Sequence, residues 1–418
     1  MCQSKSHGHG QAHGHHHHGH DHHHGPESTR REALRRIGKA GLVLAAAGSP
    51  WGSPVRAIAD DQHPVGVGPA SDRLFDLKRV AEGIYAAIAR PTAMLNCNAA
   101  VVVNKDHVLV VDTHSKPSAA RALIQQIRAE VTELPVRYVV DSHLHGDHAM
   151  GNEAYPEAFG PSVETISSVK TREWLEKLGL PRLRASLEPL PRQIADFRAR
   201  LEASTDESRR AVLKAQIEGL EAYLKEMTPP RVTLPTMTFE RRLVLHRGGR
   251  EVHLMFLGRA HTAGDVVAYI PSERTIATGD LMHGLLPYMG DGFPDEWPAT
   301  LRALEALDFD RVIPGHGAVQ EGKSVLAEFR GYVEEVNEKV ADGVERGRPL
   351  DELQKSVTPG TLRSLADAGA RRRLERELGA LFTLEKPEDQ VVDGVAGNVR
   401  EVFTYYTERK GQAELPTR

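Results

Sequence analysis

Cysteine is almost absent from this 418-residue sequence, which contains only Cys2 and Cys97. If the N-terminus is removed, Cys97 is alone and no intrachain disulfide can form. Stability must then come from a hydrophobic core and any bound metal. We expect Cys97 to be a small buried residue rather than a reactive thiol.

An excess of charge of either sign is also missing. The chain has 53 Lys and Arg against 57 Asp and Glu, for a formal net charge of −4. This balance argues against a nucleic-acid-binding protein, which would usually carry a basic surface. It gives no support for a strongly anionic partner either.

The apolar run near the N-terminus, AGLVLAAAG, is too short to span a bilayer, which takes about 20 residues. A basic stretch with Arg30 and Arg31 precedes it, and a small-residue pattern ending at Ala59 follows. This order is typical of a secretory signal, and the arginine pair resembles a twin-arginine export signal. We expect cleavage after Ala59 and a periplasmic or secreted protein with no stable membrane anchor. The alternative is a disordered basic tail on a cytoplasmic protein.

Residues 7–24 contain half of the 22 histidines. Such a composition cannot pack a core, but it can bind metal loosely. We assign residues 1–59 to this His-rich segment plus the export signal. A metal-binding or storage role for the chain loses its support if cleavage removes the segment.

The following chain has two β-rich halves, which suggest a sandwich flanked by helices. Residues 79–89 are predicted as a first strand, and residues 99–114 as a hairpin that turns at Asn104–Asp106. Residues 136–140, VRYVV, are predicted as a short buried strand. In the second half, Gly248 and Gly249 mark another hairpin turn.

A helical insert over 168–229 separates these halves within a domain predicted at 60–322, and 323–418 is predicted to be helical. Apolar residues recur in the insert at spacings of three and four, which predicts an amphipathic helical hairpin. They are Ile194, Phe197 and Leu201, then Leu213, Ile217, Leu220, Leu224 and Met227. Packing of the stripes on each other or on the domain is the simplest interpretation. A lid, or a homo-oligomer contact through the insert, is the alternative.

The stretch DSHLHGDHAMGN, residues 141–152, holds His143, His145, Asp147 and His148 directly after a predicted strand. Burying so many polar groups costs solvation free energy, and a bound metal ion is the obvious compensation. The two histidines before Gly146 are two residues apart, so on an extended backbone they face the same way. Asp147 and His148 follow the glycine, so their side chains can turn toward the position of a second metal ion.

Three further candidate ligands, His261, Asp280 and His316, each follow a predicted strand in the second half and lie near glycines. Five histidines and two aspartates are enough for two metals. Imidazole and carboxylate ligands suit zinc, and also iron or manganese. One metal could take His143, His145 and His261, the other Asp147, His148 and His316, with Asp280 bridging both.

These motifs resemble those of the metallo-β-lactamase-fold superfamily in its dinuclear hydrolase form. The pattern is H-x-H-x-D-H, a later histidine, a later aspartate and a final G-H-G, over roughly 79–317 without the insert. The resemblance implies an α/β fold, a four-layer αββα sandwich with the metals at one edge of the two sheets, and the same ligand set. It also implies that Asp112 supports the ligand loop through hydrogen bonds rather than binding metal.

One departure separates the branches of this family. True β-lactamases of the fold have cysteine or serine where Asp280 stands, whereas a bridging aspartate is the pattern of glyoxalase-II-like enzymes and lactonases. The flavodiiron branch is disfavoured because its flavodoxin-like domain is lacking. The RNA-processing branch is disfavoured by the export signal and the lack of a basic surface.

The expected activity is hydrolysis of a small-molecule ester, thioester, lactone or amide by a hydroxide generated at two zinc ions. Asp147 and Asp280 are the candidate catalytic residues, with Asp147 also placed to orient the hydroxide and shuttle its proton. The alternatives are an iron-dependent oxidoreductase, like the persulfide dioxygenase branch, and a β-lactamase-like activity.

Other residues are weaker candidates. His283 and Tyr288 could meet the substrate or lie behind the ligands. Phe293 and Trp297 could line a pocket, although packing is the default expectation. We treat His246 and His253 as ordinary strand residues, and His114 remains ambiguous.

Overall fold

The computed structural model describes residues 73–382 and 386–411. The predicted His-rich segment, export signal and cleavage after Ala59 lie outside the described residues. Among the described residues, no helix combines the length and the hydropathy needed to cross a membrane.

The first sheet has seven strands whose order in space equals their order in the chain. The first four strands pair antiparallel, and the last four pair parallel. The strands are β1 (Phe75–Ala81), β2 (Ile84–Ala89), β3 (Ala99–Val103), β4 (Val108–Val111), β5 (Val136–Val140), β6 (Glu164–Ser168) and β7 (Met237–Phe239).

The prediction of a single strand over 79–89 is wrong. This stretch contains the end of β1 and all of β2, which form a tight hairpin. Gly83 has a φ of 66°, a conformation that glycine adopts without steric cost and that reverses the chain here. The predicted hairpin of β3 and β4 is confirmed, with Val103 paired to Val108.

The second sheet has six strands in the order β13-β12-β11-β10-β9-β8. The predicted turn at Gly248 and Gly249 is confirmed between β8 and β9, and both residues have positive φ, as a two-residue hairpin requires. His246 and His253 lie in these two strands, as expected. The strands are β8 (Arg242–Arg247), β9 (Arg250–Phe256), β10 (Val266–Ile270), β11 (Thr275–Gly279), β12 (Arg311–Pro314) and β13 (Gln320–Glu321).

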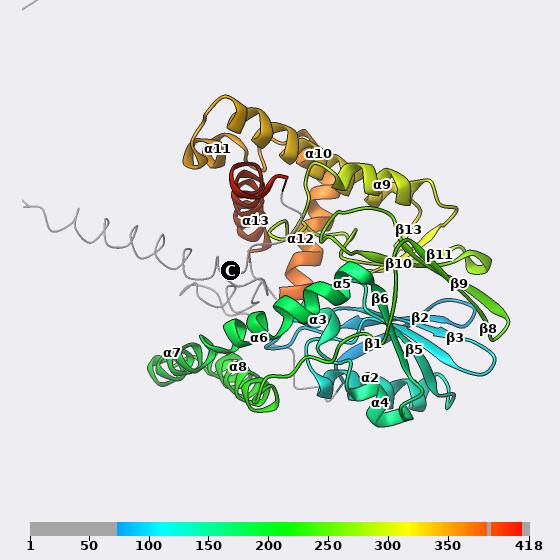
Figure 1. Ribbon diagram of the computed structural model, residues 1–418. Helices are drawn as coiled ribbons and strands as arrows, with labels where there is room; N and C mark the ends of the chain where they lie inside the picture. Colours follow the sequence, from blue (N-terminus) through cyan, green and yellow to red (C-terminus); the bar gives the residue numbers. More distant parts are fainter. Residues whose placement is uncertain (1–72, 383–385, 412–418) are drawn as a thin grey trace, which may run out of the picture. The chain divides into compact units, whose positions relative to one another are not determined.

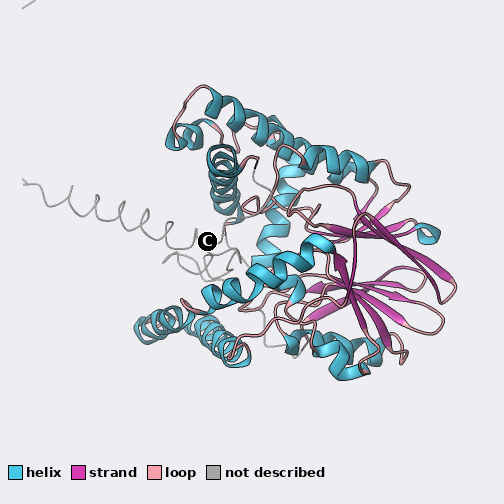
Figure 2. Ribbon diagram, viewed as in Figure 1, coloured by secondary structure: helices cyan, strands magenta, loops and turns pink. Residues whose placement is uncertain are grey.

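The two sheets pack face to face, and helices cover their outer faces (Figures 1 and 2). Between the sheets lies an apolar core to which both contribute, for example Val102 and Ile166 from the first and Leu254 and Ala268 from the second. Helices α2 (Pro117–Glu130) and α4 (Ala154–Phe159) pack on the outside of the first sheet. The predicted αββα sandwich is therefore confirmed.

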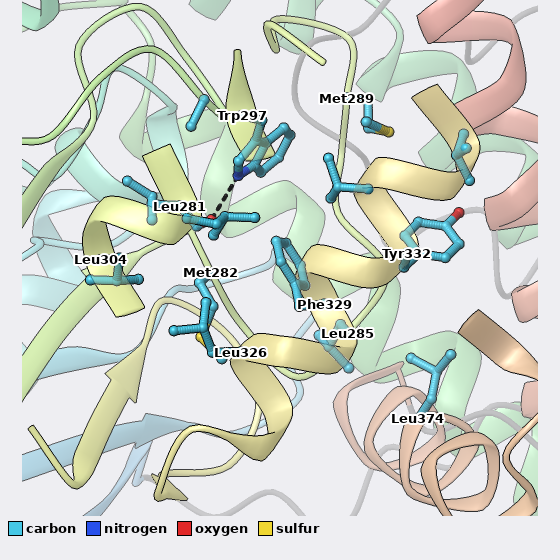
Figure 3. Packing of buried hydrophobic residues seen from close by; sticks show 14 of the residues in the cluster. Leu281, Met282, Leu285, Met289, Trp297, Leu304, Leu326, Phe329, Tyr332 and Leu374 are labelled. Atoms are coloured by element: carbon cyan, nitrogen blue, oxygen red, sulfur yellow. Dashed lines mark hydrogen bonds between the residues drawn. The ribbon is translucent and has the colours of Figure 1, made fainter. Parts of the chain in front are cut away.

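The outer face of the second sheet is covered by α9 (Trp297–Glu305), which lies between β11 and β12 in the chain, and by helices that follow β13. They share one large core with the loop after β11. In Figure 3, Trp297 donates a hydrogen bond from Nε1 to the Leu281 carbonyl at 2.9 Å and lies near Phe329. The helices that follow β13 are α10 (Ser324–Glu345), α11 (Leu350–Ser356), α12 (Ala368–Phe382) and α13 (Pro387–Thr404), with short turns η4 (Arg363–Leu365) and η5 (Tyr405–Arg409).

The insert between β6 and β7 is helical, and its predicted hairpin is confirmed as α7 and α8. Asp206 begins α8 by accepting hydrogen bonds from the backbone N–H groups of Ser208 and Arg209. The apolar stripes are buried against each other and against Leu144 and Met150 of the ligand loop. Among the described residues, the insert exposes no large hydrophobic side chain. A homo-oligomer contact through the insert stays a prediction. Its elements are α5 (Val169–Trp174), η2 (Leu175–Gly179), α6 (Leu180–Leu187), α7 (Leu190–Ala203) and α8 (Glu207–Glu226).

Candidate metal centre

The candidate ligands lie in the loops that follow four strands. The first sheet contributes the loop after β5, where the one-turn helix α3 (Gly146–Ala149) carries Asp147 and His148. His261 follows β9, Asp280 follows β11, and His316 follows β12. The structure brings all seven predicted ligand residues together at one edge of the sandwich.

His143, His145 and His261 form one group. The Nδ1 atom of His145 lies 3.0 Å from Nε2 of His143 and 2.9 Å from Nε2 of His261. All three side chains are buried. Three ring nitrogens thus converge on one point, as ligands of a single ion do.

Asp147, His148 and His316 form a second group. Nε2 of His316 lies 3.1 Å from a carboxylate oxygen of Asp147 and 3.4 Å from Nε2 of His148. His148 is fully buried, while the Asp147 side chain is 17% exposed. Asp147 is therefore the most exposed member of this group.

Asp280 lies between the two groups. Its Oδ1 is 3.5 Å from Nε2 of His148, and its Oδ2 is 3.7 Å from Nε2 of His261. Oδ2 is also 3.5 Å from Nε2 of His316. One carboxylate thus faces histidines of both groups, which is the position that a bridging ligand needs.

The chemistry of these donors fits divalent cations. Burial lowers the pKa of His261 to about 3 and that of His143 well below its ordinary value, so both rings are neutral, as metal binding requires. Burial also opposes the charged form of His316, but Asp280 and Asp147 raise its pKa to about 9. The second group therefore attracts positive charge. The buried Oδ1 of Asp280 has no hydrogen-bond partner among the described residues, so this oxygen is available to a cation.

Glycines allow the two halves of the site to approach. A Cβ atom on Gly315 would lie 2.2 Å from Oδ1 of Asp280 and 2.8 Å from Cε1 of His148. A Cβ atom on Gly279, whose φ is 51°, would lie 2.3 Å from Oγ of Ser142. No side chain fits at either position, so both glycines are needed for the close packing of the ligand loops.

Asp112 fixes the ligand loop from behind. Its carboxylate accepts hydrogen bonds from the backbone N–H of Ser142 at 2.8 Å and from Nδ1 of His148 at 2.8 Å. The residue has a φ of 70°, an uncommon conformation for a non-glycine residue that is often found at functional sites. Asp112 thereby leaves Nε2 of His148 to face the other ligands.

The weaker candidates lie around the cluster rather than in it. Nδ1–H of His261 donates to the Tyr288 carbonyl at 3.0 Å, so Tyr288 acts here through its backbone, and its ring lies against His145. The His283 ring centroid is 6.3 Å from that of His316, and burial lowers the pKa of His283 to about 4. Phe293 and Trp297 are buried core residues.

Cys97 is buried, as predicted, and burial raises its pKa to about 12. His114, which remained ambiguous in the sequence, donates from Nδ1 to the Cys97 carbonyl at 3.0 Å. The thiol also lies within 4.8 Å of ligand-type atoms of Asp112 and His148. Both residues pack behind the ligand loop.

Asp291 and its partner Arg182 were missed by the sequence analysis. Asp291 lies 2.8 Å from Nε2 of His145 and is held by two hydrogen bonds from Arg182 in the insert. Arg182 and Asp291 are 109 residues apart, and no spacing rule links them. The one available signal was an aspartate between two glycines in the loop after β11.

Asp265 was missed as well. It closes the turn after His261 by accepting hydrogen bonds from the backbone N–H and the hydroxyl of Thr262. Burial raises its pKa to about 7. The residue thus shapes the loop that presents His261.

The chain is similar to several known proteins. A linear primary-alkylsulfatase from a Pseudomonas species is 24% identical over 264 residues, which cover 60% of this chain and 48% of the relative. The chain thus matches about half the length of that relative.

A search of solved structures found similar chains as well. A metallo-beta-lactamase from Pontibacter korlensis is 17% identical, with a TM-score of 0.45 over 62% of this chain and 99% of the other. The DIM-1 metallo-beta-lactamase is 18% identical, with a TM-score of 0.44 over 62% and 97%. The family model of the metallo-beta-lactamase superfamily matches residues 93–316, just over half of the sequence and the part that holds every candidate ligand. The chain belongs to the metallo-beta-lactamase superfamily.

Proposed function

We propose that this protein is a dinuclear zinc-dependent hydrolase that acts on an ester, thioester, lactone or amide of a small molecule. The position of Asp280 carries the proposal, because its two oxygens face histidines of both groups. The superfamily commonly performs metal-dependent hydrolysis, which agrees with this reading.

The residues divide into two sets of ligands. His143, His145 and His261 would hold one ion, and Asp147, His148 and His316 the other, with Asp280 shared. When bound, a pair of zinc ions lowers the pKa of water and polarises the carbonyl that is attacked. Neutral imidazoles and ionised carboxylates are the states in which these side chains bind metal.

Asp147 is the best candidate for moving a proton. Its side chain is the most exposed of the seven ligand residues, at 17% against 10% for Asp280 and 8% for His316. The contact with Nε2 of His316 at 3.1 Å fixes one of its oxygens. The carboxylate can therefore orient a water molecule and accept its proton during the attack.

We propose that a small pocket beside His283 takes a short apolar group of the substrate. It lies between the loop at 283–286 and helices α10 and α12, and Leu285, Phe329 and Leu374 are among the residues that line it. Apolar walls with a few polar groups are typical of small-molecule sites.

A sulfate ester is a second candidate substrate. The relative described above, about half of whose length matches this chain, is named a linear primary-alkylsulfatase. A primary alkyl sulfate therefore belongs in a substrate panel beside carboxyl esters, thioesters, lactones, amides and β-lactams. Turnover of the sulfate alone would replace the carbonyl substrate with a sulfate ester and keep the metal centre.

The test is the metal content of the full chain, measured by mass spectrometry. A double variant, His143→Ala with His148→Ala, is the control because it keeps the His-rich segment, which binds metal loosely. An excess of about two zinc ions in the unmodified chain would support the proposal. An excess of one iron would overturn it and favour the oxidoreductase alternative.

Export is a separate proposal. The twin-arginine-type signal would place the mature protein in the periplasm or outside the cell. N-terminal sequencing of the protein from the native host is expected to begin at Asp60. An intact N-terminus would favour a cytoplasmic protein that retains its His-rich segment.

A further inference from the structure

Asp291 lies where three distant parts of the chain meet. It is buried in the loop between β11 and α9, and its Oδ2 lies 2.8 Å from Nε2 of His145. The other ring nitrogen of His145, Nδ1, faces His143 and His261. One nitrogen of this ring therefore points at the candidate metal position while the other contacts Asp291.

Arg182 of the insert fixes the Asp291 carboxylate. Its Nη1 donates to Oδ2 at 2.8 Å and its Nη2 donates to Oδ1 at 3.0 Å. The two side chains are only 8% and 7% exposed. A buried guanidinium that donates two parallel hydrogen bonds sets both the position and the plane of a carboxylate.

Arg409 holds the backbone of the same loop. It lies in η5, close to the C-terminal end of the described residues, and donates to the carbonyls of Gly290 and Gly292. These carbonyls flank Asp291 on both sides. The insert thus holds the side chain of Asp291, and the C-terminal helical region holds its main chain.

We infer that Arg182 and Asp291 are positioning residues that orient the ring of His145 for metal binding, which makes the helical insert a part of the metal centre. A carboxylate that accepts the Nε2–H of His145 selects the tautomer whose Nδ1 carries the free lone pair. Without it, the ring can rotate or take the other tautomer. The inference rests on the proposed metal centre, but not on the identity of the substrate.

The test compares metal affinity in matched variants of the full chain. Asp291→Asn keeps the size of the side chain but removes its charge. Arg182→Lys keeps the positive charge but removes the guanidinium that donates two parallel hydrogen bonds. The control is Glu273→Gln, which disrupts another poorly exposed ion pair, with Arg250 at 2.8 Å on the second sheet. Affinity is measured by competition with a chromophoric zinc chelator, and ligand geometry by the visible spectrum of the cobalt-substituted protein.

Asp291→Asn is expected to weaken binding of one of the two ions by about 10–100-fold, as loss of a group behind a ligand typically does. Its cobalt spectrum should change. Arg182→Lys should show a smaller loss of affinity for the same ion. Glu273→Gln should lower stability and leave affinity and spectrum unchanged.

The outcomes separate the inference from the proposed function. Wild-type affinity and an unchanged spectrum in both Asp291→Asn and Arg182→Lys would overturn the inference while the metal centre stands. An unmodified chain that binds no metal at the cluster would overturn the proposed function itself. If Asp291→Asn does not fold, the metal affinity and cobalt spectrum of Arg182→Lys alone test the inference. This variant should fold, because it keeps a positive charge beside the buried carboxylate.

Discussion

The Nε2 atoms of His148 and His316 lie 3.4 Å apart, although His148 follows a strand of the first sheet and His316 follows a strand of the second. The edges of the two sheets therefore meet at the candidate metal centre. Neither half of the chain contains a complete ligand set.

Asp280→Ala tests the shared ligand. The variant should lose binding of one metal ion, and its turnover should fall at least about 100-fold. Removal of a residue that only supports a metal ligand can already lower activity by about 100-fold, and Asp280 is a candidate ligand itself. Its fold should remain, because Asp280 lies in a loop after β11 and outside the apolar cores. Metal content, turnover and circular dichroism measure the three effects. Turnover equal to that of the unmodified protein would rule out the dinuclear mechanism.

Gly315→Ala tests the close approach of the ligand loops. The new Cβ would lie 2.2 Å from Oδ1 of Asp280, so the carboxylate or the loop must move and metal binding should weaken. Gly331→Ala in α10 is the matched control, since a Cβ there meets nothing within 4 Å. That change should stabilise the protein by about 0.5–1 kcal/mol. Zinc affinity and urea unfolding are measured for both, and equal affinities would contradict the argument.

Glu335→Gln tests a pH-dependent contact between α10 and η4. Burial raises the pKa of Glu335, but hydrogen bonds from the backbone N–H groups of Ser364 and Arg363 outweigh burial and leave the pKa below its ordinary value. Lys339 lies 3.8 Å away and also favours the charged form. The carboxylate therefore stabilises the folded state above its unfolded pKa, about 4.3, and this stabilisation is lost as the pH falls through the lower folded value.

We expect Glu335→Gln to lower the free energy of unfolding at pH 7 by about 1–3 kcal/mol. The difference from the unmodified protein should shrink below about pH 4.3, when the native carboxyl is protonated as well. Urea unfolding at several pH values measures it. Glu338→Gln, at an exposed position of the same helix, should show little effect at any pH. If the difference in unfolding free energy between Glu335→Gln and the unmodified protein is the same above and below about pH 4.3, the charged carboxylate of Glu335 does not stabilise the fold.

Trp297→Ala tests the core beneath the loop that carries Asp280 and Asp291. The indole is fully buried, donates to the Leu281 carbonyl and lies 5.7 Å from the His261 ring, measured between centroids. The change should cost about 3–5 kcal/mol of stability. Val392→Ala, at an exposed site in α13, should stay within about 0.5 kcal/mol. Chemical unfolding of the two variants gives both values, and similar costs would be inconsistent with this packing.

Local patterns in the sequence predicted a sandwich flanked by helices, the helical hairpin and the candidate ligands, while the four-layer order of the sandwich and the site at its edge came from the family resemblance. The locally predicted features depend on periodicity, on strand ends and on glycines, which act over a few residues. The division of 79–89 into two strands had a local signal at Gly83, which the apolar content of the stretch obscured.

Contacts between distant segments could not be predicted in this way. The pairing of Arg182 with Asp291 depends on how the insert folds back over the sheets, and no spacing encodes it. The contact of His261 with Tyr288 uses a backbone carbonyl, which every residue has, so the side chain gave no information about it.

The division of the ligands between two sheets has a consequence for biosynthesis. Four candidate ligands, from His143 to His148, leave the ribosome more than one hundred residues before His261, and Arg409 follows much later. A nascent chain therefore presents a half-site before the other half exists, and a metal captured at that stage would have an incomplete set of ligands. Stable metal loading should accordingly follow the release and folding of the whole chain, so the supply of metal in the compartment where folding finishes would decide which ion the protein carries.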